Sequence, residues 1–388
     1  MRNLSMYFMN KKEKIAVSEE IKIHEARDNN QLEQHGSSWD KLIGKCPQST
    51  PTQSFGWLDA YFRYKLPANA RWICLFAYNK NNDLLAVYPL IILKRTGFFR
   101  VYFQLFKIPF DPYHTVRTDG LFLPGYEYLL NAFIGYLNRE FRAYSIIKIQ
   151  RIPDFSPSMR YFNHPERKLR YFKKQITFED FISINGSYET YRETLNSKFR
   201  RELKRQERRL HEKTEVLYHL DERQRSNEVN LQYFKEIENS GWKAREGQTI
   251  MLRPGDSELF SSATQRFHKN GWMEWNFVEA DDKTISGMLG VKINEVVYYW
   301  RIGYDENYSF YSPGQLLVNK LIDGNFNKPE IQEVNFMNQR KWLRVWKVQT
   351  RELFDLIILP GNIFLGLLGK ILLKLEYFLG KKKFWRFR

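Results

Sequence analysis

The chain has 388 residues, of which 43% are hydrophobic and 16% aromatic, so the composition excludes a disordered protein and is sufficient for buried cores in two ordinary domains. Sixty-one basic against 44 acidic side chains give a net charge of +17, which suits nucleic acid, an anionic membrane surface or a phosphorylated substrate without choosing among them. Cys46 and Cys74, the only cysteines, have no metal-ligand spacing, which argues against a disulfide scaffold or zinc site and suits a reducing cytoplasm.

The N-terminal half is predicted to mix strands and helices. Residues 1–20 are polar and hold no apolar segment of signal-peptide length, so we expect no secretion. Alternation and helical periodicity predict strands at 21–25, 71–78, 84–93, 98–106 and 144–150, and helices at 32–43, 52–64 and 126–141. This α+β half has no glycine-rich phosphate loop of its own. A degenerate copy of the second half would explain that.

A long basic helix is predicted over 187–213. Eight of the sixteen residues from Lys198 to Lys213 are basic, and Arg201 and Arg205 share one side with residues 204, 208 and 209. One interpretation is a solvated helix stabilised by i,i+4 pairs. The other is that Lys198, Arg201 and Arg205 grip phosphates of a sugar-nucleotide, CoA, tRNA or lipid head group.

Candidate substrate and catalytic residues follow this helix. A helix over 222–239 is stopped by Gly241, which places Trp242 and Lys243 in a loop suited to substrate contacts, although a Trp there also commonly plugs a core. After a helix at 257–269, Glu274 lies on a strand at 272–280. Burial beside aromatic residues would raise its pKa and make it a general base for an amine. An ordinary exposed carboxylate is the alternative.

The stretch 283–328 reads as strand, strand, aromatic turn and helix. Strands at 284–293 and 295–304 are predicted to form a hairpin at Asn294. Ser312 is a candidate N-cap, Pro313 suits the first helical position, and Gly314 would let a ligand approach the backbone. Unpaired N–H groups at such a helix start bind phosphate. The alternative is simply an efficient helix start.

This order of elements resembles the acyl-CoA site of the GNAT acyltransferases. Three stretches, at 195–210, 238–243 and 303–314, resemble one branch, the CelD-type acetyltransferases of polysaccharide biosynthesis, which are related to the Fem-type aminoacyltransferases. The resemblance covers 187–359 well, and the N-terminal half more loosely. It implies an α/β (α+β) fold of two tandem GNAT-like lobes, at 21–183 and 187–359, each a mixed, mostly antiparallel sheet flanked by helices.

The resemblance also implies site residues and an activity. It places the acyl donor, acyl-CoA or acetyl-CoA, at Ser312, Gly314 and Gln315, and adds Tyr304, Asp305 and Arg344 to the substrate contacts. The family usually shows an acidic residue, a glycine and then a lysine before a tryptophan. Here Asn335 replaces the acidic residue, the glycine is missing, and Arg344 is the nearest match to the lysine.

The implied function is N-acyl transfer from acyl-CoA to an amine on a sugar or sugar-nucleotide for a bacterial surface polysaccharide, with no metal. One alternative is a Fem-type transferase that uses aminoacyl-tRNA and acts on a cell-wall precursor. Only this Fem-type alternative has a nucleic acid, tRNA, as a partner. Another alternative is a non-catalytic membrane-associated binding protein. In place of acyl-CoA, the donor could also be an acyl-carrier protein.

The C-terminal segment 362–388 is predicted to be a basic amphipathic helix. Its apolar residues are interrupted by Lys370, Lys374 and Glu376, whereas a spanning helix needs about twenty nearly uncharged residues. Three consecutive lysines at 381–383 and interfacial aromatics suit a helix lying in an anionic membrane surface. We therefore expect a cytoplasmic protein, peripheral on the inner face of the membrane. The alternative is a tail that packs on its own lobe or on a second copy.

Overall fold

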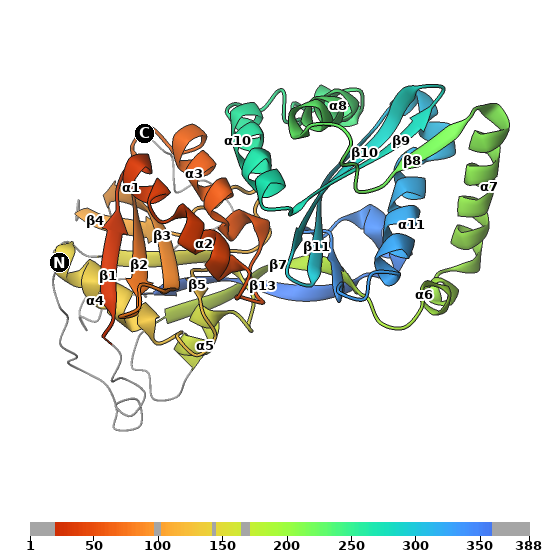
Figure 1. Cartoon of the computed structure of the whole chain (residues 1–388). Helices are drawn as coiled ribbons and strands as arrows, with labels where there is room; N and C mark the ends of the chain where they lie inside the picture. Colours follow the sequence, from red (N-terminus) through yellow and green to blue (C-terminus); the bar gives the residue numbers. More distant parts are fainter. Residues whose placement is uncertain (1–19, 97–101, 142–144, 164–170, 359–388) are drawn as a thin grey trace.

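The computed structural model describes residues 20–96, 102–141, 145–163 and 171–358, which form two lobes joined through one mixed sheet (Figure 1). The strands of this described part are β1 Lys22–Ala26, β2 Ala70–Tyr78, β3 Leu84–Thr96, β4 Tyr102–Lys107, β5 Leu121–Phe122, β6 Ser145–Ile152, β7 Tyr171–Ser183, β8 Val216–His219, β9 Met273–Ala280, β10 Lys283–Ile293, β11 Val296–Tyr304, β12 Glu333–Asn335 and β13 Gln349–Ile358.

Helices cover the faces of this sheet. They are α1 Asn29–Glu33, α2 Gly36–Ile43, α3 Phe55–Tyr64, α4 Leu129–Glu140, α5 Pro157–Asn163, α6 Tyr188–Thr194, α7 Ser197–Lys213, α8 Asn227–Asn239, α9 Trp242–Arg245, α10 Asp256–Lys269 and α11 Pro313–Phe326, with 3-10 turns η1 Pro51–Gln53, η3 Glu306–Tyr311 and η4 Lys341–Trp346. Among the described residues, none of the helices has the length and apolar character that crossing a bilayer requires.

The two halves of the chain exchange their last strands. The sheet runs β1-β2-β3-β4-β6-β13-β7-β12-β11-β10-β9-β8, with β5 beside β3. β7 ends the first half of the chain but pairs with β12 of the second, and β13 ends the second half but pairs with β6 of the first. At the centre β7 and β13 pair antiparallel over their whole length (Figure 1). The lobes are therefore held together by backbone hydrogen bonds as well as by side chains.

The halves repeat one order of elements. In the first, β4 is followed by α4 and then by β6, which lies parallel to β4. In the second, β11 is followed by α11 and then by β12, which lies parallel to β11. All the other strand pairs are antiparallel. This confirms the predicted mixed α/β fold of tandem halves. The predicted amphipathic segment 362–388 lies outside the described residues, and the domain boundaries stay a prediction.

Several helix limits differ from those that periodicity predicts. The single helix expected over 187–213 is broken between α6 and α7, because the Asn196 side chain accepts the Lys198 N–H at 2.9 Å and starts a new helix. The helix expected from Glu222 begins at Asn227, after the N-cap Ser226. Trp242 and Lys243, expected in a loop, form the first turn of the short helix α9.

The hairpin of β10 and β11 is central to the second lobe, and its tip docks on the first. Asn294 at the turn has φ 54, a conformation that Asn tolerates better than most residues. Its side-chain amide donates to the Ile43 and Cys46 carbonyls at 3.2 and 3.0 Å. Helices α8 and α10 pack on one face of this hairpin's sheet, and α7 and α11 lie on the other.

A gap opens in the sheet between β11 and β12. Only the first three residues of β11, Val296 to Tyr298, pair with β12, which ends at Asn335. β11 continues to Tyr304, so its last residues diverge from the neighbouring strand. Helix α11 begins at Pro313, shortly after β11 ends. The parallel pair therefore splays beside a helix N-terminus, where backbone donors are free to meet a ligand.

Candidate active site

A cavity of about 590 Å³ lies where β11 and β12 separate. Its lining comes from β11, the start of α11, the end of α8 with α9, the segment from Phe336 to Leu343, and Tyr113 of the first lobe. This size is ordinary for a pocket that encloses a small molecule. Residues from both halves of the chain thus form one site.

The start of α11 forms one wall of this cavity. Ser312 is the N-cap residue of α11 as predicted, but it has a left-handed backbone, φ 50 and ψ 51, and its side chain makes no capping hydrogen bond. Its carbonyl instead accepts from Gln315 N at 2.9 Å and Leu316 N at 3.2 Å. Pro313 occupies the first helical position as predicted. Within the described part of the chain no acceptor is found for the Gly314 N–H, which leaves this donor for a ligand.

Gly314 and Gln315 are fixed by their neighbours. A Cβ on Gly314 would lie 3.3 Å from Ile302 Cδ1, so a side chain there would press against β11 and fill the space beside the helix start. The Gln315 side chain accepts a hydrogen bond from the Trp346 indole N–H at 2.8 Å. The helix start is therefore held between β11 and η4, and a donor thioester could lie along it.

Three charged groups, Glu238, Arg301 and Lys243, also line the cavity. The Glu238 carboxylate is fully buried and accepts from Arg301 Nε at 2.7 Å and from the Ile250 N–H at 2.9 Å. Lys243 Nζ lies 3.3 Å from Glu238 Oε1 and donates to the Ile302 carbonyl at 2.5 Å. Ile302 therefore contacts Lys243 through its carbonyl and Gly314 through its side chain. The lysine and the helix start face one cavity.

The surroundings of Lys243 weaken its hold on a proton. Burial lowers the pKa of Lys243 to about 8, and although Glu238 opposes this, the positive charges of Arg301 and Arg340 add to the lowering. The pKa of Glu238 stays below its ordinary value, because the charges of Arg301 and Lys243 outweigh its burial. At neutral pH this pocket therefore holds an ionised carboxylate beside an amine that is partly neutral, as a proton acceptor requires.

The structure brings six of the predicted site residues together. They all line the cavity: Trp242, Lys243, Tyr304, Ser312, Gly314 and Gln315. Asp305 follows β11 directly, yet it pairs with Lys283 Nζ at 2.6 Å and accepts the Asn307 N–H, so it holds the turn into η3. Arg344 is exposed on η4 and is not part of the cavity lining.

Glu274 lies elsewhere in the second lobe. The prediction that burial raises its pKa is confirmed. Its carboxylate is 3.1 Å from Lys328 Nζ, just beyond the C-terminal end of α11. A helix of 14 residues is about 21 Å long, so Glu274 is at the end of α11 opposite Gly314. Its role as a base stays a prediction, and the structure does not place it in the cavity.

The basic residues of α7 also lie outside the cavity lining. Leu203 and Leu210 are buried, whereas Lys198, Arg201 and Arg205 are exposed. Arg205 is 2.5 Å from Glu202 on the same helix. The structure therefore has both features expected of α7, an exposed cationic face and intrahelical ion pairs.

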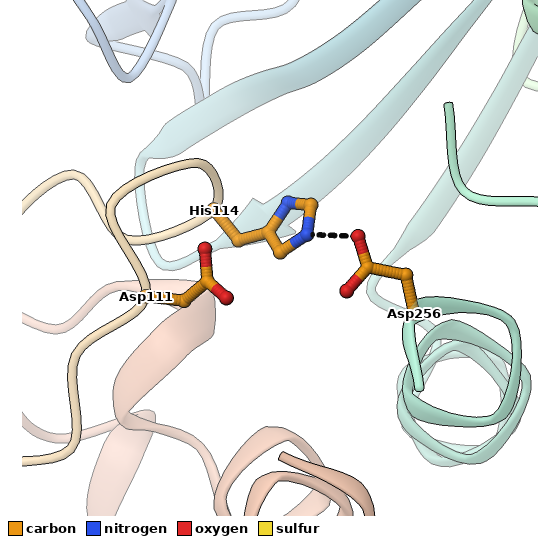
Figure 2. Close-up of side chains that lie close together, drawn as sticks. All are labelled: Asp111, His114 and Asp256. Carbon is orange, nitrogen blue, oxygen red and sulfur yellow. Dashed lines mark hydrogen bonds and ion pairs between the residues drawn. The ribbon is translucent and has the colours of Figure 1, made fainter. Parts of the chain in front are cut away.

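A buried ionic cluster joins the lobes behind the cavity (Figure 2). His114 Nε2 lies 2.6 Å from Asp256 Oδ2, and Asp111 is adjacent on the same loop as His114 (Figure 2). His114 Nδ1 is 3.2 Å from Arg301, whose guanidinium can only donate, so the imidazole carries its proton on Nε2 and donates it to Asp256. The cluster thus connects the first lobe to the Arg301–Glu238 pair.

This cluster has the residue types of a metal site but the bonding of an ion-pair network. The carboxylates already have cations: Lys65 Nζ is 2.6 Å from Asp256 and 3.8 Å from Asp111, and Arg253 reaches the same two groups at 2.8 and 3.7 Å. Both nitrogens of His114 are engaged. Burial and the Arg301 charge lower the pKa of His114 although Asp256 opposes them, so the ring is neutral. Lys65 and Arg253 therefore balance the two carboxylates.

Sequence reasoning missed Glu238, Arg301 and Arg340 as site residues. Glu238 begins the stretch 238–243 that resembles the CelD-type family. Arg301 is the one charged residue of β11, a strand rich in aromatic residues. A charged residue inside an otherwise buried strand needs a partner, which could have indicated Arg301. No local pattern predicts which carboxylate that partner is.

Comparison with known proteins identifies the domain that carries this cavity. Residues 197–340 match the family described as acetyltransferase (GNAT) domain. These residues include α7, the hairpin, α11 and β12, so the part of the second lobe that carries the cavity is similar to a GNAT acetyltransferase domain. A search of curated proteins finds no match.

Solved structures share the fold over most of the chain. A crystal structure of FemX is similar with a TM-score of 0.55 and 13% identity, covering 86% of this chain and 96% of that one. A conserved protein of unknown function from Bacteroides thetaiotaomicron is similar with a TM-score of 0.55 and 10% identity, covering 87% and 100%. Two-lobed proteins of this architecture therefore exist beyond this chain, and at these identities the likeness concerns the fold alone.

Proposed function

We propose that the protein is an N-acyltransferase that uses acyl-CoA, with acetyl-CoA the simplest donor. The observation that carries the proposal is the free N–H at the start of α11, which faces a cavity shared with Lys243. The donor carbonyl would lie against this helix end, where backbone donors stabilise the negative charge that develops on the oxygen. Ser312, Gly314 and Gln315 are the donor-binding residues of this proposal.

The reaction proposed is direct attack without a covalent enzyme intermediate. The acceptor nitrogen forms a bond to the thioester carbonyl carbon, the carbon–sulfur bond breaks, and the thiolate leaves as CoA. The nitrogen loses one proton, which neutral Lys243 Nζ is placed to accept. Glu238 would stabilise the resulting ammonium. The sequence suggests Glu274 for this step, but Lys243 has the better position because it lines the cavity.

The acceptor proposed is an amine on a sugar or sugar-nucleotide for a surface polysaccharide, as the CelD-type resemblance implies. Trp242 and Tyr304 line the cavity and offer aromatic surfaces to a sugar ring. We further propose lobes at 21–183 and 187–359, with a basic segment at 362–388 that attaches a cytoplasmic enzyme to the inner face of the membrane. The exchange of β7 and β13 means that neither lobe completes its sheet alone.

Calorimetry with acetyl-CoA tests the donor site. The parent should bind, and Gly314→Val should weaken binding at least tenfold, because the added side chain meets Ile302 and occupies the space beside the helix start. Gly324→Ala is the matched control, since that glycine lies on the same helix with nothing within 4 Å of an added Cβ. Absence of binding by the parent, or equal binding by Gly314→Val, would refute this donor site.

A second candidate is transfer from aminoacyl-tRNA to a cell-wall precursor. The exposed basic face of α7 favours it, because a polyanion could lie along that face. The Fem-type relatives named by the sequence resemblance share the architecture. Transfer of a radiolabelled aminoacyl group that requires tRNA, in a protein that does not bind acetyl-CoA, would favour this candidate over the first.

A further inference from the structure

We propose that Arg340 and Lys341 form an oxyanion subsite of the cavity, so that the acceptor amine is part of a molecule that also bears a phosphate or carboxylate. This inference rests on the proposed function and specifies its substrate class. The observation is an excess of positive charge. Among the described residues that line the cavity, four have basic side chains, and one, Glu238, has an acidic side chain. The basic residues are Lys243, Arg301, Arg340 and Lys341.

Glu238 cannot balance this charge, because it is already shared. Its Oε1 atom is 2.7 Å from Arg301 and 3.3 Å from Lys243. Within the described residues neither the Arg340 guanidinium nor the Lys341 ammonium has an ion-pair or hydrogen-bond partner. The Asp180 carboxylate contacts Arg340, but it accepts the backbone N–H of that residue, at 3.0 Å, and does not pair with the guanidinium. Both side chains line the cavity and are exposed to solvent, and within the described residues neither has a protein counter-charge.

The Arg340 charge also acts on the cations around it. Burial lowers the pKa of Arg340, and repulsion from Arg301 adds to the lowering. Arg340 in turn contributes to the lowered pKa of Lys243 and of Arg151, after the larger effect of burial on each. Charges that repel one another across a cavity raise its free energy unless an anion binds between them. An oxyanion with two or three acceptor oxygens would relieve this repulsion.

The position of Arg340 favours the acceptor as the source of the anion. The donor wall is the start of α11, where Gln315 is held by Trp346. Arg340 instead lies near Arg301 and Arg151. Arg151 belongs to the first lobe, and its guanidinium donates a hydrogen bond to the Asn338 side chain at 3.1 Å. Tyr113 of the same lobe also lines the cavity. Arg340 therefore places the anion toward the first lobe, whereas Lys341 begins η4, which contacts the helix start through Trp346.

Calorimetry on the full chain tests the subsite with two probes, inorganic pyrophosphate and CoA, at one fixed ionic strength. Arg340→Gln should weaken pyrophosphate binding about tenfold or more, as expected for loss of a charged hydrogen bond, and should leave CoA binding within about twofold. Arg340→Lys should recover part of the loss. Arg71→Gln is the matched control, because it removes one exposed positive charge from the start of β2 and leaves the same net charge.

Three results would overturn the proposal. The first is no pyrophosphate binding by the parent. The second is equal binding by the parent and Arg340→Gln, with Lys341→Gln as the second variant if the first does not fold. The third is an equal loss of CoA affinity in Arg340→Gln, which would assign the cations to the phosphates of the donor. The proposed function is tested separately, because acetyl-CoA binding and its sensitivity to Gly314→Val do not depend on the pyrophosphate result.

Discussion

The protonation of Lys243 is the most direct test of the proposed chemistry, and it needs no knowledge of the acceptor. With the pKa of Lys243 at about 8, this side chain is neutral in roughly 24% of the molecules at pH 7.5, whereas an ordinary lysine is neutral in about 0.1% of them. Neutral amines react with acetic anhydride and charged ones do not. Lys243 should therefore be labelled much earlier in a pH series than ordinary lysines.

The perturbation is Glu238→Gln, which keeps the shape of the side chain and removes its charge. Glu238 raises the pKa of Lys243 against the larger effect of burial, so its loss should lower that pKa further. An opposite charge at this distance shifts a pKa by about 1 to 3 units, which would make Lys243 mostly neutral at pH 7.5. Acceptance of a proton from the acceptor amine would then become less favourable, and the rate should fall although more of the lysine is neutral.

The assay is competitive labelling with trace acetic anhydride between pH 6 and 11, followed by digestion and mass spectrometry. Lys80, exposed in the turn between β2 and β3, is the internal reference. Folding of the variant is checked by its melting temperature, because Glu238→Gln leaves the buried Arg301 without its carboxylate. A labelling midpoint for Lys243 equal to that of Lys80, or a midpoint that rises in Glu238→Gln, would refute the reasoning.

Three further predictions concern other parts of the chain. Arg201, Arg205 and Arg208, three exposed arginines of α7, can be replaced together by glutamate. Binding of a polyanionic substrate, followed by gel-shift or affinity measurements, should be abolished, and the fold should be kept because Leu203 and Leu210 are unchanged. Unchanged binding with a lower melting temperature would mean that α7 has a structural role. Asp256→Asn should lower the free energy of unfolding in urea by about 1.5 to 3 kcal/mol, since Lys65 and Arg253 lose their nearer carboxylate and keep only Asp111, at 3.8 and 3.7 Å. His114 and Lys65 hold the pKa of Asp256 below its ordinary value although burial opposes them, so the stability due to the carboxylate is present above about pH 4 and is lost as pH falls, and the variant should lack that loss. In a flotation assay the full chain should float with anionic vesicles and be released by high salt, whereas a chain ending before residue 362 should not float. A full chain that does not bind the vesicles would contradict the membrane role.

Local turn chemistry made the second lobe predictable. Asn294 marks the hairpin because few residues accept a positive φ, and Pro313 marks the start of α11 because its missing N–H costs nothing there. The buried Leu203 and Leu210 of α7 follow from helical periodicity. Each of these features depends on residues close together in the sequence. They were enough to predict the start of α11, which forms one wall of the cavity.

Long-range pairing explains what the sequence did not reveal. β7 was missed because its first half is exposed and carries Lys173 and Lys174, so no apolar alternation marks it. It is a strand because β13, far along the chain, pairs with it. Glu238 and Arg301 likewise meet only when α8 packs on β11, where the glycine at 303 lets the helix backbone approach closely. Their partners depend on topology rather than on spacing.

The repeated halves suggest why only one of them carries the cavity. The connection between β11 and α11 is short, residues 305–312, whereas the corresponding connection between β4 and α4 spans 108–128. Part of that longer segment serves the other lobe: Tyr113 lines the cavity, and the His114 carbonyl accepts from Trp300 Nε1 at 2.9 Å.

The helix after the longer connection lacks the features proposed for the donor site. Where α11 has Gly314 as its second residue, α4 has Leu130, which is fully buried and fills the space beside the strand. A large apolar side chain at this position stabilises the first lobe and blocks approach to the helix start. The helix start of the first half is therefore closed, whereas that of the second half lines a cavity to which the first half contributes Tyr113.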